Sequence, residues 1–222
     1  MPRSLLFIAV VLSTLTLLAG DQSSRALFDG RSLDGWTVRG GTASYKVENG
    51  EIVGTTTEGS PNTFLCTNKD YGDFELEFDV KCDPKLNSGC QIRSHVADKE
   101  MTFEYEGKTK TIKPGTVFGY QCEVANAKPT SGNFWDEARQ ARWLDDISGK
   151  PGAEDAYKPG EWNHYKIVAR GDHIQSWVNG VACADFHDSR DASGLIGLQV
   201  HGIKKGTGPY EVRWKNVMVR EL

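Results

Sequence analysis

Three short segments share one spacing of polar residues and could supply acid–base chemistry. Gln91-Ile92-Arg93, Gln121-Cys122-Glu123 and Gln199-Val200-His201 each place a polar side chain on either side of an apolar one. Because side chains alternate between the two faces of a β-strand, the polar pair of each segment shares a face. If the three strands lie in one sheet, a guanidinium, a carboxylate, an imidazole and three amides converge on one surface. We expect a site there; the structural alternative is a solvated outer sheet face.

We expect these segments to lie in an all-β fold, because short runs of alternating polarity recur with Gly, Asn, Asp and Pro between them. This spacing predicts a β-sandwich, or jelly roll, of two antiparallel sheets. The pairs Asn49-Gly50 and Asn179-Gly180 are typical of tight hairpin turns. The strand signals cover residues 44–47, 51–54, 63–67, 74–81, 91–94, 117–124, 163–169, 174–178, 195–201 and 212–220.

Two longer insertions interrupt this pattern, and both leave the ends of strands that carry polar pairs. Residues 97–115 predict a small β-arm. Residues 126–160 form a connection of a length that is typical of a lid or binding loop. We expect this loop to close over the polar surface and to bring Trp135, Glu137 and Arg142 to the site.

The first 20 residues have the pattern of a secretory signal peptide. Arg3 is followed by an apolar run from Leu5 to Leu18 and then by small residues. The run is short for a membrane span, so a signal cleaved near Gly20 is favoured over an uncleaved anchor. We therefore expect a secreted or periplasmic protein, with one domain over residues 21–222 and no membrane contact after cleavage. Removing Arg3 from the formal charge of −4 leaves about −5, and without a basic stripe nucleic-acid binding is disfavoured.

The chain contains an odd number of cysteines, so at least one thiol is free. Three of the five occupy apolar positions of expected strands, where a thiol behaves as a small hydrophobe. A domain of about 200 residues buries enough surface to be stable without disulfides. We favour mostly buried core thiols over a disulfide framework for Cys66, Cys82, Cys90, Cys122 and Cys183.

The segment Asn87-Ser88-Gly89-Cys90-Gln91-Ile92-Arg93-Ser94 resembles the signature of the 3-keto-disaccharide hydrolase family, also called 3-keto-glucoside lyase/hydratases. The resemblance implies a concanavalin A-like β-sandwich. The order Gln121-Cys122-Glu123 departs from the commonest subgroup and is similar to a variant whose loop here reads Asp136-Glu137-Ala138-Arg139-Gln140. Other segments similar to the family, in the family's order, are residues 27–30, 33–36, 119–123, 160–163, 177–180, 197–201 and 214–217.

The resemblance implies a carbohydrate substrate whose 3-hydroxyl is already oxidised to a ketone. The ketone acidifies the neighbouring C–H, so the glycosidic oxygen leaves by β-elimination and water adds back. This chemistry needs a base, a donor to the enolate and an acid for the leaving oxygen. We expect Glu123 or His201 as base, Arg93 as donor, and Glu137 or His201 as acid. Binding of the sugar is expected from Gln91, Gln121, Gln199, Trp135 and Arg142.

Other interpretations of the same residues remain open. Arg93 and Glu123 could form a structural ion pair, and Glu137, Arg139 and Arg142 could pair on a solvated turn. The sequence shows no evident cofactor, and a divalent cation lacks a ligand spacing such as His-x-x-x-His. A non-catalytic carbohydrate-binding module or a laminin G-like adhesion domain would use the same sandwich, since fold alone does not give function.

Overall fold

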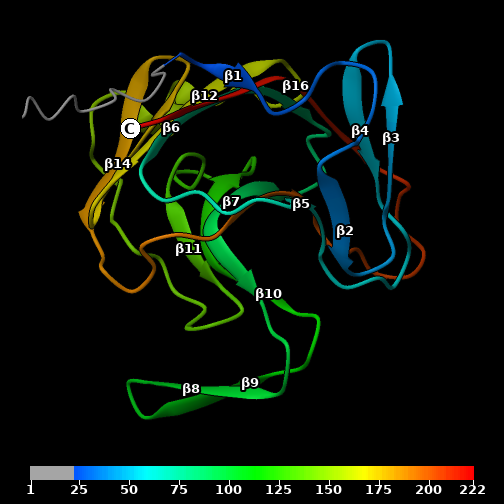
Figure 1. The fold of residues 1–222 in the computed structure, drawn as a ribbon. Helices are drawn as coiled ribbons and strands as arrows, with labels where there is room; N and C mark the ends of the chain where they lie inside the picture. The colour runs from blue at the N-terminus through cyan, green and yellow to red at the C-terminus, as the bar shows by residue number, and fades with distance from the viewer. Residues whose placement is uncertain (1–22) are drawn as a thin grey trace, which may run out of the picture.

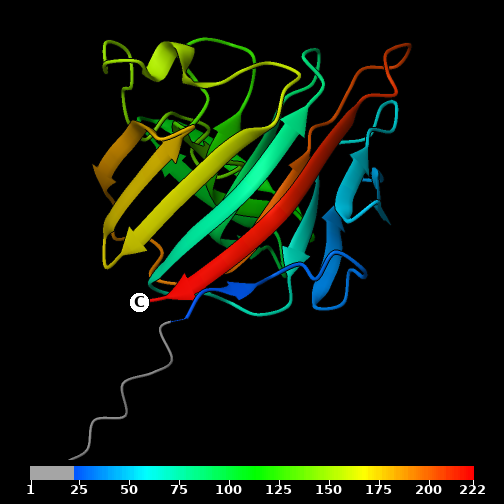
Figure 2. The same ribbon diagram turned by 90° about the horizontal axis from the view of Figure 1, so that it is seen from above.

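The computed structural model describes residues 23–222, and these form two antiparallel β-sheets packed face to face. The larger sheet has eight strands in the order β14-β13-β12-β6-β16-β4-β3, with β1 paired to β16. It arches over the smaller sheet in Figure 1 and is seen from above in Figure 2. Its strands are β1 (Arg25–Ala26), β3 (Ser44–Glu48), β4 (Glu51–Thr55), β6 (Phe74–Cys82), β12 (Asn163–Arg170), β13 (His173–Val178), β14 (Val181–His187) and β16 (Glu211–Glu221).

The smaller sheet carries all three polar segments of the sequence analysis. Its six strands lie in the order β11-β10-β7-β15-β5-β2, so β10, β7 and β15 are immediate neighbours. The predicted convergence of the three segments in one sheet is therefore confirmed. The strands are β2 (Trp36–Gly40), β5 (Thr63–Thr67), β7 (Ser88–Val96), β10 (Val117–Val124), β11 (Phe134–Glu137) and β15 (Leu195–Val200).

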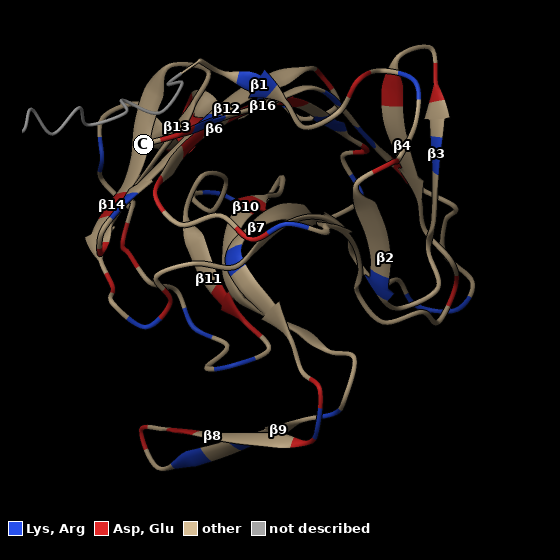
Figure 3. Cartoon of the chain, in the orientation of Figure 1, with Lys and Arg blue, Asp and Glu red and all other residues tan. Residues whose placement is uncertain are grey.

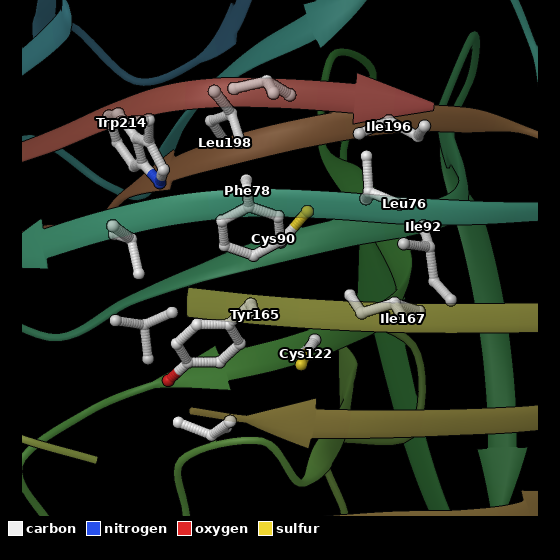
Figure 4. Close-up of a cluster of buried hydrophobic side chains, with 14 of the residues drawn as sticks. Leu76, Phe78, Cys90, Ile92, Cys122, Tyr165, Ile167, Ile196, Leu198 and Trp214 are labelled. Atoms are coloured by element: carbon white, nitrogen blue, oxygen red, sulfur yellow. The ribbon is translucent and has the colours of Figure 1, made fainter. Parts of the chain in front are cut away.

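Apolar side chains from both sheets fill the space between them (Figure 4). Strand β6 shows the cause most clearly: Phe74, Leu76, Phe78 and Val80 are completely buried, while the residues between them are half-exposed. Phe78 stacks on Tyr165 with ring centroids 5.2 Å apart. Each such side chain contributes about 1.5–3 kcal/mol on burial, so this layer fixes which face of each strand is turned inward.

All five cysteines are free and buried. Four of them lie in the core between the sheets, and Cys66 lies in a second apolar cluster with Phe64, Val117 and Leu195. The prediction of buried thiols in place of a disulfide framework is thus confirmed.

The predicted turns and the β-arm are also present. Asn49-Gly50 and Asn179-Gly180 all have positive φ, as the tight hairpin turns β3–β4 and β13–β14 require. Strands β8 (Met101–Tyr105) and β9 (Lys108–Ile112) pair with each other and project from the smaller sheet on the side away from the larger one. Figure 3 shows acidic and basic segments interspersed along the chain, including on this arm.

The long insertion differs from the expected lid. Residues 134–137 form strand β11, which pairs with β10 at the edge of the smaller sheet, and α1 (Ala153–Ala156) is a single helical turn. The expected signal peptide lies outside the described residues. Within residues 23–222 no helix is long and apolar enough to cross a membrane.

Candidate active site

Strand β10 places Gln121 and Glu123 on the outer face of the smaller sheet, while Tyr120 and Cys122 point into the core. This is the alternation expected from the sequence. Gly89 lies opposite Glu123 on β7, and a side chain there would meet Gln121, because a Cβ would lie 2.6 Å from Gln121 Cγ. The glycine thus leaves room for the Gln121 amide to lie flat beside the Glu123 carboxylate.

A directed chain of hydrogen bonds ends on Glu123. Ser94 Oγ donates to Gln91 Oε1 (2.5 Å), and Gln91 Nε2 donates to Gln121 Oε1 (2.9 Å). Gln121 Nε2 then donates to Glu123 Oε2 (3.0 Å). Asn87 Nδ2 donates to the other carboxylate oxygen, Oε1. Both oxygens of Glu123 therefore accept an amide hydrogen, which fixes the orientation of its carboxyl group.

Strand β11 adds Trp135 and Glu137 to the same face. Trp135 lies opposite Gln121 in the β10–β11 register, whereas Phe134 and Asp136 are completely buried on the other side. Glu137 Oε1 accepts a hydrogen bond from Asn62 Nδ2 (2.9 Å). A second carboxyl group is thereby held beside the first by an element that the sequence analysis interpreted as a loop.

Seven residues from separate segments line one cavity of about 280 Å³ over this face. Five of the predicted site residues are among them, and Trp135 packs edge-on against Trp143 with ring centroids 5.1 Å apart. His201 follows β15 directly, and its Nδ1 lies 2.7 Å from the carbonyl oxygen of Gly202. Because a carbonyl only accepts, Nδ1 carries a proton. The lining residues are Asn87, Gln121, Glu123, Trp135, Glu137, Trp143 and His201.

Burial perturbs both carboxyl groups of the cavity. Glu123 is 6% exposed, and burial raises its pKa to about 7 against the opposing effect of the Gln121 and Asn87 hydrogen bonds; the nearby charge of Glu137 adds to the increase. Burial also raises the pKa of Glu137, opposed by the Asn62 hydrogen bond and the charge of His201. Two carboxyl groups with raised pKa values in one cleft are typical of acid–base chemistry.

The structure contradicts the expected position of Arg93. Strand β7 is irregular here: the β7–β10 register shifts between Phe118 and Tyr120, and Arg93 has a φ of 43°. Between the paired positions on either side of this shift, β7 has two residues and β10 has one, which is a β-bulge. The bulge reverses the alternation of side chains, so that Ser94, and not Arg93, shares a face with Gln91.

The guanidinium of Arg93 lies at the ends of the central strands β6 and β12 of the larger sheet and does not line the cavity. Its Nε donates to Gly72 O (2.8 Å), its Nη1 to Gly171 O (2.6 Å) and its Nη2 to Asp73 Oδ1 (2.8 Å). The alternative ion pair with Glu123 is absent too, because the carboxylate that Arg93 contacts belongs to Asp73. Arg93 joins the two sheets and does not line the site.

Arg142 also lies outside the cavity. Its guanidinium stacks over the Tyr105 ring of the β-arm, 4.7 Å from the centroid, and donates to Gln140 Oε1 (2.9 Å). The same loop buries Arg139 against Asp136 and Asp191, so its arginines hold the loop in place. The expected closure of Arg142 over the site is therefore wrong, whereas Trp135 and Glu137 reach it.

Gln91 and Gln199 are completely buried and are not part of the cavity lining. Gln91 acts through Gln121, as described above. Within residues 23–222 neither amide atom of Gln199 has a hydrogen-bond partner, and the same is true of Asn87 Oδ1 in the cavity wall. Unpaired buried polar atoms are rare in folded proteins, and Asn87 Oδ1, which lies in the cavity wall, is free to bind a ligand or water.

Sequence reasoning missed three residues of the site: Asn62, Asn87 and Trp143. Asn87 begins the family-like segment, yet it precedes β7 and has no place in a strand alternation. Asn62 lies just before β5 and bridges Glu137 to the backbone N–H of Gly202, a contact across 140 positions of the chain. No local pattern reveals such a contact.

Among residues 23–222 no group of three or more His, Cys, Asp or Glu side chains is arranged to hold a metal ion.

Comparison with known proteins then identifies the family. A model of the 3-keto-alpha-glucoside-1,2-lyase-like domain matches residues 23–220. The chain belongs to this family. No curated protein matches the sequence significantly.

Solved structures of related shape share the fold of this family member. A candidate glycosyl hydrolase from Parabacteroides distasonis has 20% identity and a TM-score of 0.56, with 90% of this chain and 94% of that chain covered. The carbohydrate-binding module CBM66 from Bacillus subtilis has the same identity and TM-score, covering 84% and 96%. A galectin-like protein of unknown function from Bacillus subtilis has 9% identity and a TM-score of 0.51, covering 86% and 92%. These likenesses confirm the predicted lectin-like β-sandwich.

Proposed function

We propose that this protein is an exported enzyme that cleaves 3-keto-glycosides by β-elimination, with water then adding to complete a net hydrolysis. Membership of the 3-keto-alpha-glucoside-1,2-lyase-like family supports a carbohydrate substrate. The observation that carries the proposal is the pair Glu123, which is buried, and Glu137, which is half-buried: two carboxyl groups with raised pKa values in one cavity.

The reaction needs two proton transfers on adjacent carbons. A base removes the proton from C2, which the C3 ketone acidifies, and the electron pair forms an enolate with its charge on the C3 oxygen. The enolate collapses to a C1=C2 double bond and expels the glycosidic oxygen, which takes a proton from an acid. Water then adds its oxygen to C1 and a hydrogen to C2, giving the free 3-keto sugar.

Glu123 is the base in this proposal. Its two oxygens accept hydrogen bonds from Gln121 and Asn87, which favours the ionised form, while burial raises its pKa to about 7. A base is most effective when its pKa lies near the working pH, because it is then both ionised and strongly basic. The fixed carboxyl orientation directs its remaining lone pairs into the cavity.

Glu137 is the acid. Its raised pKa increases the protonated fraction, and it also borders a second, larger cavity beyond the first. A proton donor at such a border can serve an oxygen that links two halves of a substrate. We assign the contact with the C3 oxygen to His201, since Arg93 lies elsewhere and His201 lines the cavity.

The sugar ring is proposed to lie between the carboxyl groups and the tryptophan pair. Trp143 is 37% exposed and packs against Trp135 at the cavity rim, so both rings are available for contact with the apolar face of a sugar. Asn87 Oδ1, an unpaired acceptor in the cavity wall, is available to a hydroxyl or to water.

The test is to incubate the purified protein with 3-keto-trehalose, with 4-nitrophenyl 3-keto-glucoside and with both unoxidised parents. Cleavage of the keto-sugars alone is expected. Glu123→Gln should lower kcat/KM on both keto-sugars by about 10²–10⁴, the usual contribution of a general base. Glu137→Gln should slow the disaccharide far more than the nitrophenyl compound, whose leaving group needs no proton. Glu104→Gln, on the exposed face of the arm, is the matched control.

A non-catalytic carbohydrate-binding module is the other candidate, and the structural likeness to CBM66 is the observation that favours it. It would be supported, and the enzyme proposal overturned, if no keto-sugar were cleaved while an unoxidised glycan bound with an affinity that Trp143→Ala reduces.

A further inference from the structure

A second cavity of about 710 Å³ adjoins the site on the same face of the smaller sheet. Both cavities include Glu137 in their walls. The larger one extends from there across β5 and β2 toward the root of the β-arm, where residues 114–117 form its far wall. Its volume lies within the roughly 300–1,000 Å³ that is usual for small-molecule sites.

The junction between the two cavities is fixed by Asn62. Its Nδ2 donates to Glu137 Oε1 (2.9 Å), and its Oδ1 accepts from the backbone N–H of Gly202 (2.9 Å), next to His201. Asn62 lines the larger cavity, so the Glu137 carboxyl group is held at the passage from one to the other. A leaving group that takes its proton from Glu137 therefore departs into the larger cavity.

The walls of this larger cavity are mostly apolar. Phe64 and Val117 belong to a buried apolar cluster against which Val96 packs. Val96 lies opposite Val117 in the β7–β10 register, is half-buried and also lines the cavity, so an aliphatic side chain borders it. Methyl groups and a phenyl ring offer no hydrogen bonds to sugar hydroxyls, which lose free energy when buried without partners.

Arg39 supplies a cation beside this apolar surface. It is an exposed residue of β2 that also lines the cavity. A guanidinium pairs well with a carboxylate through its planar pair of donors.

We propose that the larger cavity binds the leaving group of the substrate, and that this group is an aromatic aglycone bearing an anionic substituent, not a second sugar. The inference rests on the proposed function for the place of the leaving group. The apolar walls would hold the ring, and Arg39 the acidic substituent.

The test compares kcat/KM for three 3-keto-glucosides: the 4-carboxyphenyl compound, its neutral 4-carbamoylphenyl counterpart and the disaccharide 3-keto-trehalose. Val96→Asp should lower kcat/KM at least tenfold for both aryl compounds and less than twofold for the disaccharide. Arg39→Met should cost at least tenfold on the carboxyphenyl compound alone. Ala182→Asp adds the same charge at an exposed position of the other sheet and should change none of the three.

A binding experiment separates this inference from the proposed function. 4-Hydroxybenzoate, the aglycone alone, should shift the methyl NMR signals of Val96 and Val117 in the wild-type protein, and it should not shift those of Val117 in Val96→Asp. Shifts without any cleavage would leave the binding cavity intact and overturn the enzyme proposal. Cleavage with no methyl shifts, or with equal losses on all three substrates in Val96→Asp, would overturn the aglycone site.

Discussion

The surroundings of Glu123 combine two opposing effects on its proton. Gln121 and Asn87 donate hydrogen bonds to the carboxylate, which lowers the pKa, while burial and the charge of Glu137 raise it. Burial is the largest effect, so the balance leaves the pKa at about 7. The amide donors thus orient the Glu123 carboxyl group, and burial sets its pKa.

This balance predicts the pH dependence of activity. The base must be ionised, so kcat/KM should fall about tenfold per pH unit below pH 7. Glu137→Gln removes one of the causes that raise the pKa of Glu123, so the fall should begin at a lower pH. The pH profile of kcat/KM on 4-nitrophenyl 3-keto-glucoside measures both effects, because its leaving group needs no acid.

The control for this prediction is Glu104→Gln, which should keep the wild-type profile. A profile that Glu137→Gln leaves unchanged would show that the two carboxyl groups do not interact in the way described. Since interacting groups titrate as a pair, the comparison must be made on the apparent pKa of the acid limb.

The alternation of polar and apolar residues predicted the position of some site residues correctly and of others wrongly. Gln121, Glu123 and His201 reach the cavity because β10 and β15 are apolar on the core face, which fixes their register. Arg93 fails because a single extra residue reverses the alternation, and a bulge has no signal in this sequence. Asn62 and Asn87 lie just outside strands, where no periodicity applies.

At the level of elements, the irregularity of strand β7 explains why Arg93, which we expected in the site, instead connects the two sheets. Gly119 faces the irregularity on β10 with a φ of 132°, and a Cβ there would lie 2.7 Å from Ser94 Oγ. The backbone of β10 therefore approaches Ser94 closely enough to keep that side chain in contact with Gln91. The irregularity in β7 therefore positions two side chains. It places Ser94 Oγ as the first donor of the hydrogen-bond chain that ends on Glu123, and it places the Arg93 guanidinium where it joins the two sheets.

Arg93→Met should consequently act on stability and not on chemistry. The substitution leaves the carbonyl groups of Gly72 and Gly171 without their donor and breaks a pair whose cation is completely buried. We expect a loss of about 1–3 kcal/mol in the free energy of unfolding, as is usual when the donor to a buried acceptor is removed. Urea denaturation measures it, and kcat of the folded fraction should stay within twofold.

Arg170→Met is the matched control, because Arg170 is exposed at the neighbouring end of β12. It should change the free energy of unfolding by less than about 0.5 kcal/mol. If Arg93→Met kept its stability but lost kcat, a role in the reaction would have to be restored to Arg93.

Strand β11 shows why the long insertion was misinterpreted. Its segment has four residues, of which Phe134 and Asp136 are completely buried. Asp136 occupies a core-facing position because Arg139 and Arg190 neutralise it. A buried charge in place of an apolar residue removes the alternation that identifies a strand, so pairing with β10 could not be predicted locally.

At the scale of the whole molecule, the fold is held together without covalent links between its segments. All five thiols are buried, and burial raises the pKa of Cys66 and of Cys82 to about 12. Because the thiolate is the reactive form, these side chains should be inert in the folded state.

Two measurements check this. The native protein should take up no iodoacetamide at pH 8, whereas the urea-unfolded protein should take up five equivalents. Its melting temperature should not change with dithiothreitol, since a native disulfide would contribute about 2–4 kcal/mol. A reductant-sensitive melting temperature would contradict the free state of the five cysteines.

The topology of the smaller sheet also has a consequence for the time at which activity appears. Its neighbouring strands β5 and β15 come from distant parts of the chain. Asn62 contacts Glu137 across 75 positions and Gly202 across 140 positions. Contacts of such separation pay a large loop-closure cost and make folding slow. The local hairpins can form early, but the contacts of Asn62 with Glu137 and with Gly202 require segments that are distant in the sequence to come together. We therefore expect the proposed activity to appear only late in folding, after these long-range contacts have closed.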